Sequence, residues 1–265
     1  MRVARVLFQD QPVFAVINPD GAVFAVDGDP YAGGAVAGPP LGTAANLQLL
    51  APCQPSKVLC VGRNYATPVR AKGHAWPEAP VVFLKTPNAV IGPDEDILRP
   101  ENVGAFEYEG ELAVVIGRTA RRVHAADAAD CIFGYTIGND MTVRDWQQTD
   151  AHWTRAKSSD TLCPLGPWIE TDLDPANLLI ETRVNGEVQQ QGRTDDMIFS
   201  IGEIIEFVTR TMTLVPGDVI LTGAPGGTQA VGDGDEVAVT IAGIGELRNT
   251  VRQLAPATMR QGASA

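Results

Sequence analysis

The chain has 265 residues, of which 45% are hydrophobic and 20% are charged. This composition is ordinary for a folded globular protein and supplies enough apolar residues for a sizeable core. The formal net charge of -12 repels phosphate groups and anionic lipids, so neither nucleic acid nor a membrane is an expected partner. The four cysteines form no CxxC pair and no apolar leader follows Met1, which predicts no disulfide framework, no structural zinc and a cytoplasmic location.

Short strands separated by turns are predicted for the first part of the chain. Val3–Phe8, Val13–Ile17 and Ala22–Val26 are apolar runs of strand length, and an Asn-Pro-Asp-Gly turn separates the last two. The Gly- and Pro-rich stretch Tyr31–Gly42 is expected to be a loop. Residues 1–55 are therefore predicted to form a small β-rich N-terminal unit that packs on the main body.

Residues 56–255 are predicted to form the main domain, in which strands predominate. Asn185-Gly186 is the strongest local hairpin signal in the chain. Apolar runs rich in Val and Ile recur between turn signals and are expected to be strands: Val58–Val61, Val81–Leu84, Leu112–Ile116, Val219–Leu221 and Val237–Ile241.

Few helices are predicted. The clearest begins at Ser200, where Glu203 completes a capping box, and a shorter one is expected over Ala125–Cys131. Because strands outnumber helices without regular βαβ alternation, the sequence predicts a mixed, mostly β sandwich or roll. Residues 256–265 are expected to be a disordered tail.

An acidic segment precedes the buried-looking run Leu112–Ile116. On a strand, Glu109 and Glu111 point to the same face, about 7 Å apart, and repel each other unless a cation lies between them. Glu107 joins that face if the strand extends so far back. The alternative is a solvated strand edge, where Glu is common. Spacing alone leaves both interpretations open.

Asp140 and Lys157, which lie further along the chain, are candidates for the same site. Asp140 follows another buried-looking run, Ile132–Ile137, and supplies a third hard oxygen ligand suited to Mg²⁺, Mn²⁺ or Ca²⁺. Taken alone, Asp140 is interpreted as a turn aspartate, because Asn and Asp favour such positions. Lys157 is by default a surface lysine, but beside a metal it becomes a charge partner for a substrate carboxylate or enolate.

The ordered motifs of the chain resemble the fumarylacetoacetate hydrolase superfamily from about Lys57 to about Val251. Each motif is weak alone, whereas their order and spacing together are specific. They are Val61-Gly-Arg-Asn-Tyr65, Phe83-Leu-Lys85, Tyr108–Gly117, Gly134-Tyr-Thr136, Asn139–Asp145, Trp153–Lys157, Pro164–Ile169, Val184-Asn-Gly-Glu187, Met197-Ile-Phe199, Pro216–Ile220 and Gly243–Leu247.

The resemblance implies a β-sandwich roll, usually a homodimer, that acts on a small anionic 2-oxo acid. It implies a divalent cation, Mg²⁺ or Mn²⁺ with Ca²⁺ as an alternative, held by Glu109, Glu111 and Asp140. It also implies that Lys157 holds a developing oxyanion, and that Arg144 and Gln147 orient the substrate or a water. The bland alternatives are a surface ion pair for Arg144 and a solvated Gln147. The residues expected to bind substrate are Arg63, Tyr65, Thr222 and Gly223.

The chain departs from the family at two places. Family members usually carry a lid helix whose His and Glu activate water, but those positions are Pro68 and Ala71 here. Pro68 is also expected to prevent a helix from running through it, because it disfavours helical geometry at Thr67. A substrate-binding Thr of most relatives is replaced by Ala224.

Two histidines are candidates for the missing base. His74 follows the lid segment and His152 precedes Trp153, although a lone loop histidine is more often solvated. His74 is preferred because the lid is expected to bring it near the metal.

Three functions follow from these patterns. The first is a metal-dependent enzyme for 2-oxo, β-diketo or 2-hydroxy-dienoic acids, with isomerisation or decarboxylation through a metal-held enolate favoured over hydrolysis. The second is a C–C bond hydrolase that uses a substitute base. The third is a catalytically silent, metal-binding family member.

Overall fold

The computed structural model describes residues 1–32, 36–71, 73 and 75–255. The candidate base His74 and the predicted tail, residues 256–265, lie outside the described residues. No helix in these described ranges has the length and apolar character needed to cross a membrane.

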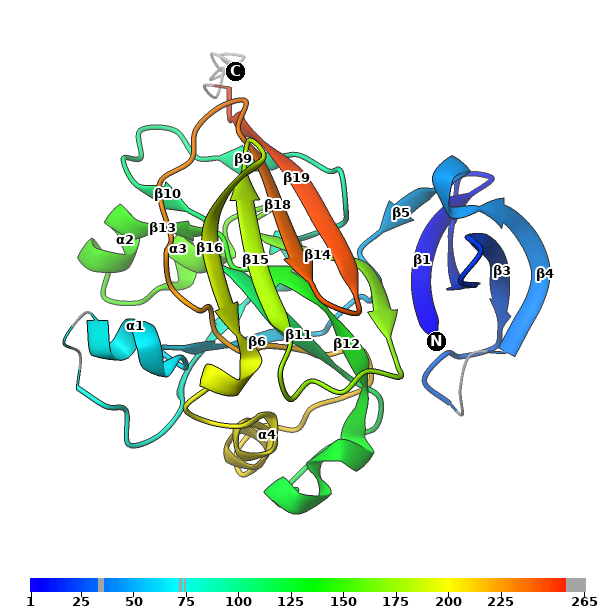
Figure 1. Ribbon diagram of the computed structural model, residues 1–265, viewed down its shortest axis with the longest axis horizontal. Coiled ribbons are helices and arrows are strands. Elements are labelled where there is room, and N and C mark those ends of the chain that lie inside the picture. The colour runs from blue at the N-terminus through cyan, green and yellow to red at the C-terminus, as the bar shows by residue number, and fades with distance from the viewer. Residues whose placement is uncertain (33–35, 72, 74, 256–265) are drawn as a thin grey trace, which may run out of the picture.

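The larger sheet contains twelve strands in the described part of the chain. Their bounds are β1 Arg2–Phe8, β2 Gln11–Ile17, β3 Ala22–Asp27, β4 Val36–Thr43, β5 Gln48–Leu50, β6 Val58–Gly62, β7 Val81–Lys85, β8 Val90–Ile91, β11 Gly110–Ile116, β12 Ile132–Asn139, β14 Cys163–Glu170 and β17 Val219–Leu221. The order is β4-β3-β2-β1-β14-β12-β11-β17-β6-β7, with β5 beside β1 and β8 beside β14. The strands of the N-terminal unit thus join the sheet through the β1–β14 pair, and Figure 1 shows them at one side of the main body.

A second sheet has the order β16-β15-β18-β19-β9 and lies in front of β11 and β12 in Figure 1. Its strands are β9 Ile97–Arg99, β15 Leu179–Val184, β16 Glu187–Arg193, β18 Glu236–Ile241 and β19 Gly245–Gln253, and a separate ribbon pairs β10 Phe106–Glu107 with β13 Thr142–Val143. The predicted hairpin at Asn185-Gly186 joins β15 to β16. The mixed, mostly β fold class is confirmed.

The helices are short. They are α1 Ala66–Ala71, α2 Arg144–Thr149, α3 Thr154–Ser158 and α4 Ile201–Thr209, with 3-10 turns η1 Ala44–Asn46, η2 Pro87–Ala89, η3 Ala125–Cys131 and η4 Thr194–Asp196. The predicted capping box is present at α4, because Ser200 Oγ accepts from the N–H of Glu203 and the Glu203 carboxylate accepts from the N–H of Ser200. The predicted segment Ala125–Cys131 is helical as a 3-10 turn.

Two local predictions are wrong, both at proline. The predicted loop Tyr31–Gly42 contains most of β4. This strand tolerates Pro39 and Pro40 because it lies at the edge of the sheet, where β3 is its only partner among the described strands. Helix α1 begins at Ala66 and runs through Pro68. Pro68 lies in the first turn, where a missing N–H removes no intrahelical hydrogen bond.

Strand β11 is the centre of the core and is buried along its whole length. Its side chains alternate between the two faces of the sheet. Leu112, Val114 and Ile116 join the cluster that contains the second sheet and α4, whereas Ala113 and Val115 join the cluster on the opposite face. The acidic residues therefore stand at the start of the most deeply buried strand.

At Gly110, between the two acidic residues, the two sheets approach each other closely. A Cβ atom there would overlap Thr182 of β15 and would lie 2.8 Å from Cγ1 of Val239 on β18. We expect Gly110→Ala to lower the free energy of unfolding by about 1–3 kcal/mol, because overpacking forces backbone shifts. Urea denaturation measures this change. Gly232→Ala is the matched control, since its Cβ meets nothing closer than 4.0 Å; equal losses in both variants would contradict the close approach.

Candidate active site

The acidic cluster forms where the start of β11 meets the end of β12. These strands are antiparallel, with Gly110 opposite Asn139, so the residues beside them become neighbours. The N–H of Asp140 donates to the carbonyl of Glu109 at 2.9 Å, and Asn139 Oδ1 accepts from the N–H of Glu109 at 3.0 Å. Ligand-type oxygens of Glu109, Glu111 and Asp140 all lie within 4.8 Å of one another. Strand register thus brings together the three residues predicted as metal ligands.

Glu111 has little compensation for its charge. Its side chain is buried, and its hydrogen bond within the described residues comes from the N–H of Gly223 at 2.6 Å. Burial, together with the nearby charges of Asp140 and Glu109, raises the pKa of Glu111 well above its ordinary value. A cation at this position would remove that penalty.

Lys157 lies between the other two carboxylates. Its Nζ donates to Glu109 Oε2 at 2.7 Å, to Asp140 Oδ2 at 2.5 Å and to Thr142 Oγ1 at 2.6 Å. Burial alone would lower the pKa of Lys157, but the charges of Asp140 and Glu109 outweigh it and raise the pKa above its ordinary value. Lys157 is therefore a buried ammonium group and not a surface lysine.

Arg144, at the start of α2, makes a second bridge to the acidic residues. Its Nε donates to Glu107 at 2.7 Å, one terminal nitrogen to Glu109 at 2.6 Å and the other to Gln147 at 2.9 Å. Burial raises the pKa of Glu109, but the charges and hydrogen bonds of Lys157 and Arg144 reverse this effect and hold it below its ordinary value. Glu107 is thus a partner of Arg144, outside the three-carboxylate cluster.

Sequence reasoning gave no role to Lys85, at the end of β7. It is fully buried, its Nζ lies 2.7 Å from Asp140 Oδ1, and it donates to the carbonyls of Met141 and Lys157. A buried ammonium needs such partners. A lysine at the end of the otherwise apolar strand β7 was the feature of the sequence that could have indicated a buried charge.

The donor set fits a hard divalent cation. Asp140 Oδ1 is buried and makes no hydrogen bond within the described part of the chain, although it forms an ion pair with Lys85. Its contact with Lys85 is close but poorly aligned for a hydrogen bond. With Glu111 also undercompensated, oxygen-only coordination suits Mg²⁺, Mn²⁺ or Ca²⁺.

A cleft of about 730 Å³ opens above the cluster. Among the residues predicted to bind substrate, Arg63 lines it, whereas Tyr65 and Thr222 are fully buried and do not. Gly223 holds Glu111 through its N–H. Direct substrate contact by these residues stays a prediction. The cleft lining also includes Lys157, Arg144, Gln147, Pro68, Phe83, Trp153 and Ala224.

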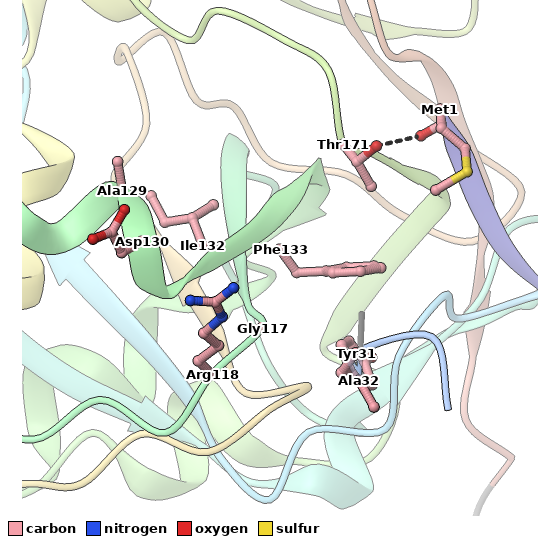
Figure 2. A pocket seen from close by; sticks show the side chains of 10 residues that line it. All are labelled: Met1, Tyr31, Ala32, Gly117, Arg118, Ala129, Asp130, Ile132, Phe133 and Thr171. Carbon is pink, nitrogen blue, oxygen red and sulfur yellow. Dashed lines mark hydrogen bonds between the residues drawn. The ribbon is translucent and has the colours of Figure 1, made fainter. Parts of the chain in front are cut away.

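A second cavity, of about 690 Å³, lies between the N-terminal unit and the β11–β12 region (Figure 2). Arg118 and Asp130, which carry opposite charges, line this cavity. The ring centroids of Tyr31 and Phe133, which also line it, are 4.9 Å apart. Its lining contains none of the acidic cluster. The candidate active site is therefore the cleft above Glu111.

Comparison with known proteins shows which family the chain resembles. Residues 57–252 match the fumarylacetoacetate (FAA) hydrolase C-terminal family model, and residues 1–52 match the Rv2993c-like N-terminal model. The chain belongs to the fumarylacetoacetate hydrolase family. Family membership makes the chain one of a group of enzymes whose named members include isomerases, a decarboxylase and a tautomerase.

Three relatives cover most of the chain. Protein Rv2993c of Mycobacterium tuberculosis is 49% identical over 89% of this chain and 96% of its own length. The oxaloacetate tautomerase YisK of Bacillus subtilis is 42% identical over 75% of this chain and 70% of its own. A crystal structure of 5-carboxymethyl-2-hydroxymuconate delta-isomerase from Mycobacterium smegmatis is 44% identical, with a TM-score of 0.88 over 96% of this chain and all of that one.

Two of the three positions at which the sequence was expected to depart from the family lie in the cleft, whereas Ala71 does not line it. Pro68 and Ala224 both line it, and neither side chain can accept a proton or donate a hydrogen bond. Of the candidate bases, His152 is exposed and does not line the cleft.

The pKa of Glu111 gives a test of stability. A carboxyl group whose folded pKa is raised costs stability as pH rises from its ordinary value of 4.5 toward the folded pKa. We expect Glu111→Gln to stabilise the metal-free protein above that pH, by about 1.4 kcal/mol for each unit by which the pKa is raised. Urea denaturation between pH 4.5 and pH 8 measures it. Glu187→Gln, at an exposed hairpin position, is the matched control; a Glu111→Gln profile parallel to wild type would refute the expectation.

Proposed function

We propose that the chain is a divalent-cation-dependent isomerase, tautomerase or decarboxylase for a small 2-oxo acid or its enol. The observation that carries this proposal is the cluster of Glu109, Glu111 and Asp140 with Lys157, at the base of a cleft. These three carboxylates are the proposed cation ligands, and the fitting cations are Mg²⁺ and Mn²⁺, with Ca²⁺ as an alternative. A divalent cation bound there supplies Lewis-acid stabilisation of negative charge on a substrate oxygen.

The cationic side chains of the cleft give the substrate its orientation. In the structure, the three N–H groups of Lys157 are engaged by Glu109, Asp140 and Thr142. With a cation on the two carboxylates, Lys157 would be released to donate an N–H to the substrate oxygen as negative charge develops there, which is the role of an oxyanion-stabilising donor. Arg144 and Gln147 are joined by a hydrogen bond and stand beside Glu109, where they orient the substrate carboxylate or a water.

The favoured reactions need no activated water. In ketonisation, the O–H proton at C2 passes to solvent water and the oxygen electron pair forms the C2 carbonyl. The former C2–C3 π pair takes a proton from solvent water at C3. In decarboxylation, the bond to the lost carboxylate breaks and its electron pair forms the same enolate. In both reactions negative charge develops on the C2 oxygen, and Lys157 is the proposed group that stabilises it.

Hydrolysis is less well supported because it needs a base for water. The described residues of the cleft lining include no histidine. The acids Glu107 and Asp145 line the cleft, but Glu107 is paired with Arg144 and Asp145 accepts the N–H of Gly104. A hydrolase using His74 as a substitute base is the alternative within the same family.

A catalytically silent protein is the alternative of another class. The buried, partly uncompensated Glu111 argues against it, since a scaffold gains nothing from a penalty that a hydrophobic residue would avoid. A panel of 2-oxo acids with added Mg²⁺ or Mn²⁺ separates the two. Oxalate binding without turnover of any member of the panel would favour the silent protein.

We expect the purified protein with Mg²⁺ or Mn²⁺ to ketonise enols of 2-oxo acids, and Lys157→Met to lower kcat about 100-fold or more through loss of the oxyanion donor. Stopped-flow loss of enol absorbance measures the rate. Lys57→Met is the matched control, because Lys57 pairs with the buried Asp218 and does not line the cleft. Fast hydrolysis of acylpyruvates that survives replacement of His74 would contradict the preference for isomerisation or decarboxylation.

A further inference from the structure

One wall of the cleft is apolar and partly open to solvent. Pro68 of α1, Phe83 of β7, Trp153 before α3 and Ala224 after β17 come from four separate segments and all line the cleft. Each is partly exposed, and the rings of Phe83 and Trp153 form an edge-to-face pair at 5.3 Å. Partly exposed aromatic side chains that converge in a cleft are typical of a subsite for an apolar ligand group.

This wall begins beside Lys157, the proposed oxyanion-stabilising residue. The Nζ of Lys157 lies 4.8 Å from the centre of the Phe83 ring. A substrate oxygen held by Lys157 therefore places the neighbouring substrate carbon near Phe83 and Trp153. We call the partly exposed surface of Pro68, Phe83, Trp153 and Ala224 the apolar wall.

At one end of the wall, α1 packs against the loop that follows β17. A Cβ atom added to Gly226 would lie 2.8 Å from Cβ of Pro68, so only glycine allows this approach. Pro68 therefore lies beside the loop that carries Ala224, and both residues line the cleft. Water in this corner of the cleft finds no hydrogen-bonding side chain on these two residues.

Arg63 is the charged side chain of the cleft that would favour a second carboxylate on the substrate over an apolar group. In the proposed function, Lys157 and Arg144 serve the C2 oxygen and the first carboxylate of the substrate. Arg63 is exposed and makes no hydrogen bond or ion pair with any residue in the part of the chain that the structure describes, so it is available to a second substrate carboxylate. An exposed ion pair changes affinity by no more than about fivefold. Burial of one side of a phenyl ring changes it by about 10- to 100-fold.

We propose that the preferred substrate is a 2-oxo acid, or its enol, with an aromatic or branched aliphatic substituent on C3, and that the apolar wall binds this substituent. The proposal rests on the proposed function and adds the substrate class. Trp153 and Phe83 are its specificity-determining residues.

Two enols that differ only at C3 provide the test. Enolphenylpyruvate has a phenyl group on C3, whereas the enol of oxaloacetate has a carboxylate there. With Mn²⁺-loaded wild-type protein, we expect kcat/KM for ketonisation of enolphenylpyruvate to exceed that for the oxaloacetate enol by about tenfold or more. This comparison uses the unaltered protein, so it does not depend on the folding of any variant.

Replacing Trp153 tests the wall itself. Trp153→Ala is expected to raise KM for enolphenylpyruvate about tenfold with little change in kcat. The same variant is expected to leave KM for the oxaloacetate enol unchanged. Trp153→Phe is expected to restore most of the lost affinity for enolphenylpyruvate. A merely structural role, through α3 and Lys157, would instead lower kcat for both enols. Trp76→Ala is the matched control, because Trp76 is 51% exposed and lies outside the cleft lining.

The outcomes separate the two proposals. Turnover of neither enol, with Mg²⁺ or Mn²⁺, would overturn the proposed function. Turnover of the oxaloacetate enol with equal or greater kcat/KM, and its loss in Arg63→Met, would overturn only the inference about the apolar wall.

Discussion

The antiparallel register of β11 and β12 is the constraint on which the site depends. It places Glu109, Glu111 and Asp140 together at the start of a fully buried strand, where like charges are costly unless cations compensate them. The protein supplies Lys157 between two of these carboxylates and Lys85 behind Asp140. Glu111 is left with one backbone hydrogen bond within the described residues. The charges of Glu109 and Asp140 are therefore compensated by lysines, whereas the charge of Glu111 is not.

The rest of the fold keeps this junction in place. Gly110 lets the second sheet pack closely against the start of β11, on the face opposite the side chains of Glu109 and Glu111. Strand β17 runs beside β11, so that Gly223 reaches Glu111. Since the surrounding strands are the core of the protein, the acidic residues cannot move apart without disturbing it. Rigid strands hold the reactive groups, whereas α1 and the loop after β17 shape the cleft above them.

Sequence patterns predicted β1–β3, β6, β7, β11, β17, β18 and the β15–β16 hairpin, but not β4, β14 or β19. They also predicted the α4 capping box and the grouping of Glu109, Glu111, Asp140 and Lys157. These features follow from local periodicity or from ordered motifs. Pattern reasoning failed at Pro68, because tolerance of proline depends on its position in a helical turn, which exact helix bounds decide. It also missed Lys85, whose role appears only when β7 and β12 are placed in space. Long-range contacts of this kind leave no local pattern.

The central claim is that the three carboxylates bind one divalent cation. Titration of metal-free protein with Mn²⁺, followed by electron paramagnetic resonance of the free ion, tests it without any substrate. The account predicts one Mn²⁺ bound per chain, displaced by excess Mg²⁺ and lost in Asp140→Asn. Absence of a saturable Mn²⁺ site in the folded wild-type protein, or full retention of binding in Asp140→Asn, would contradict the account.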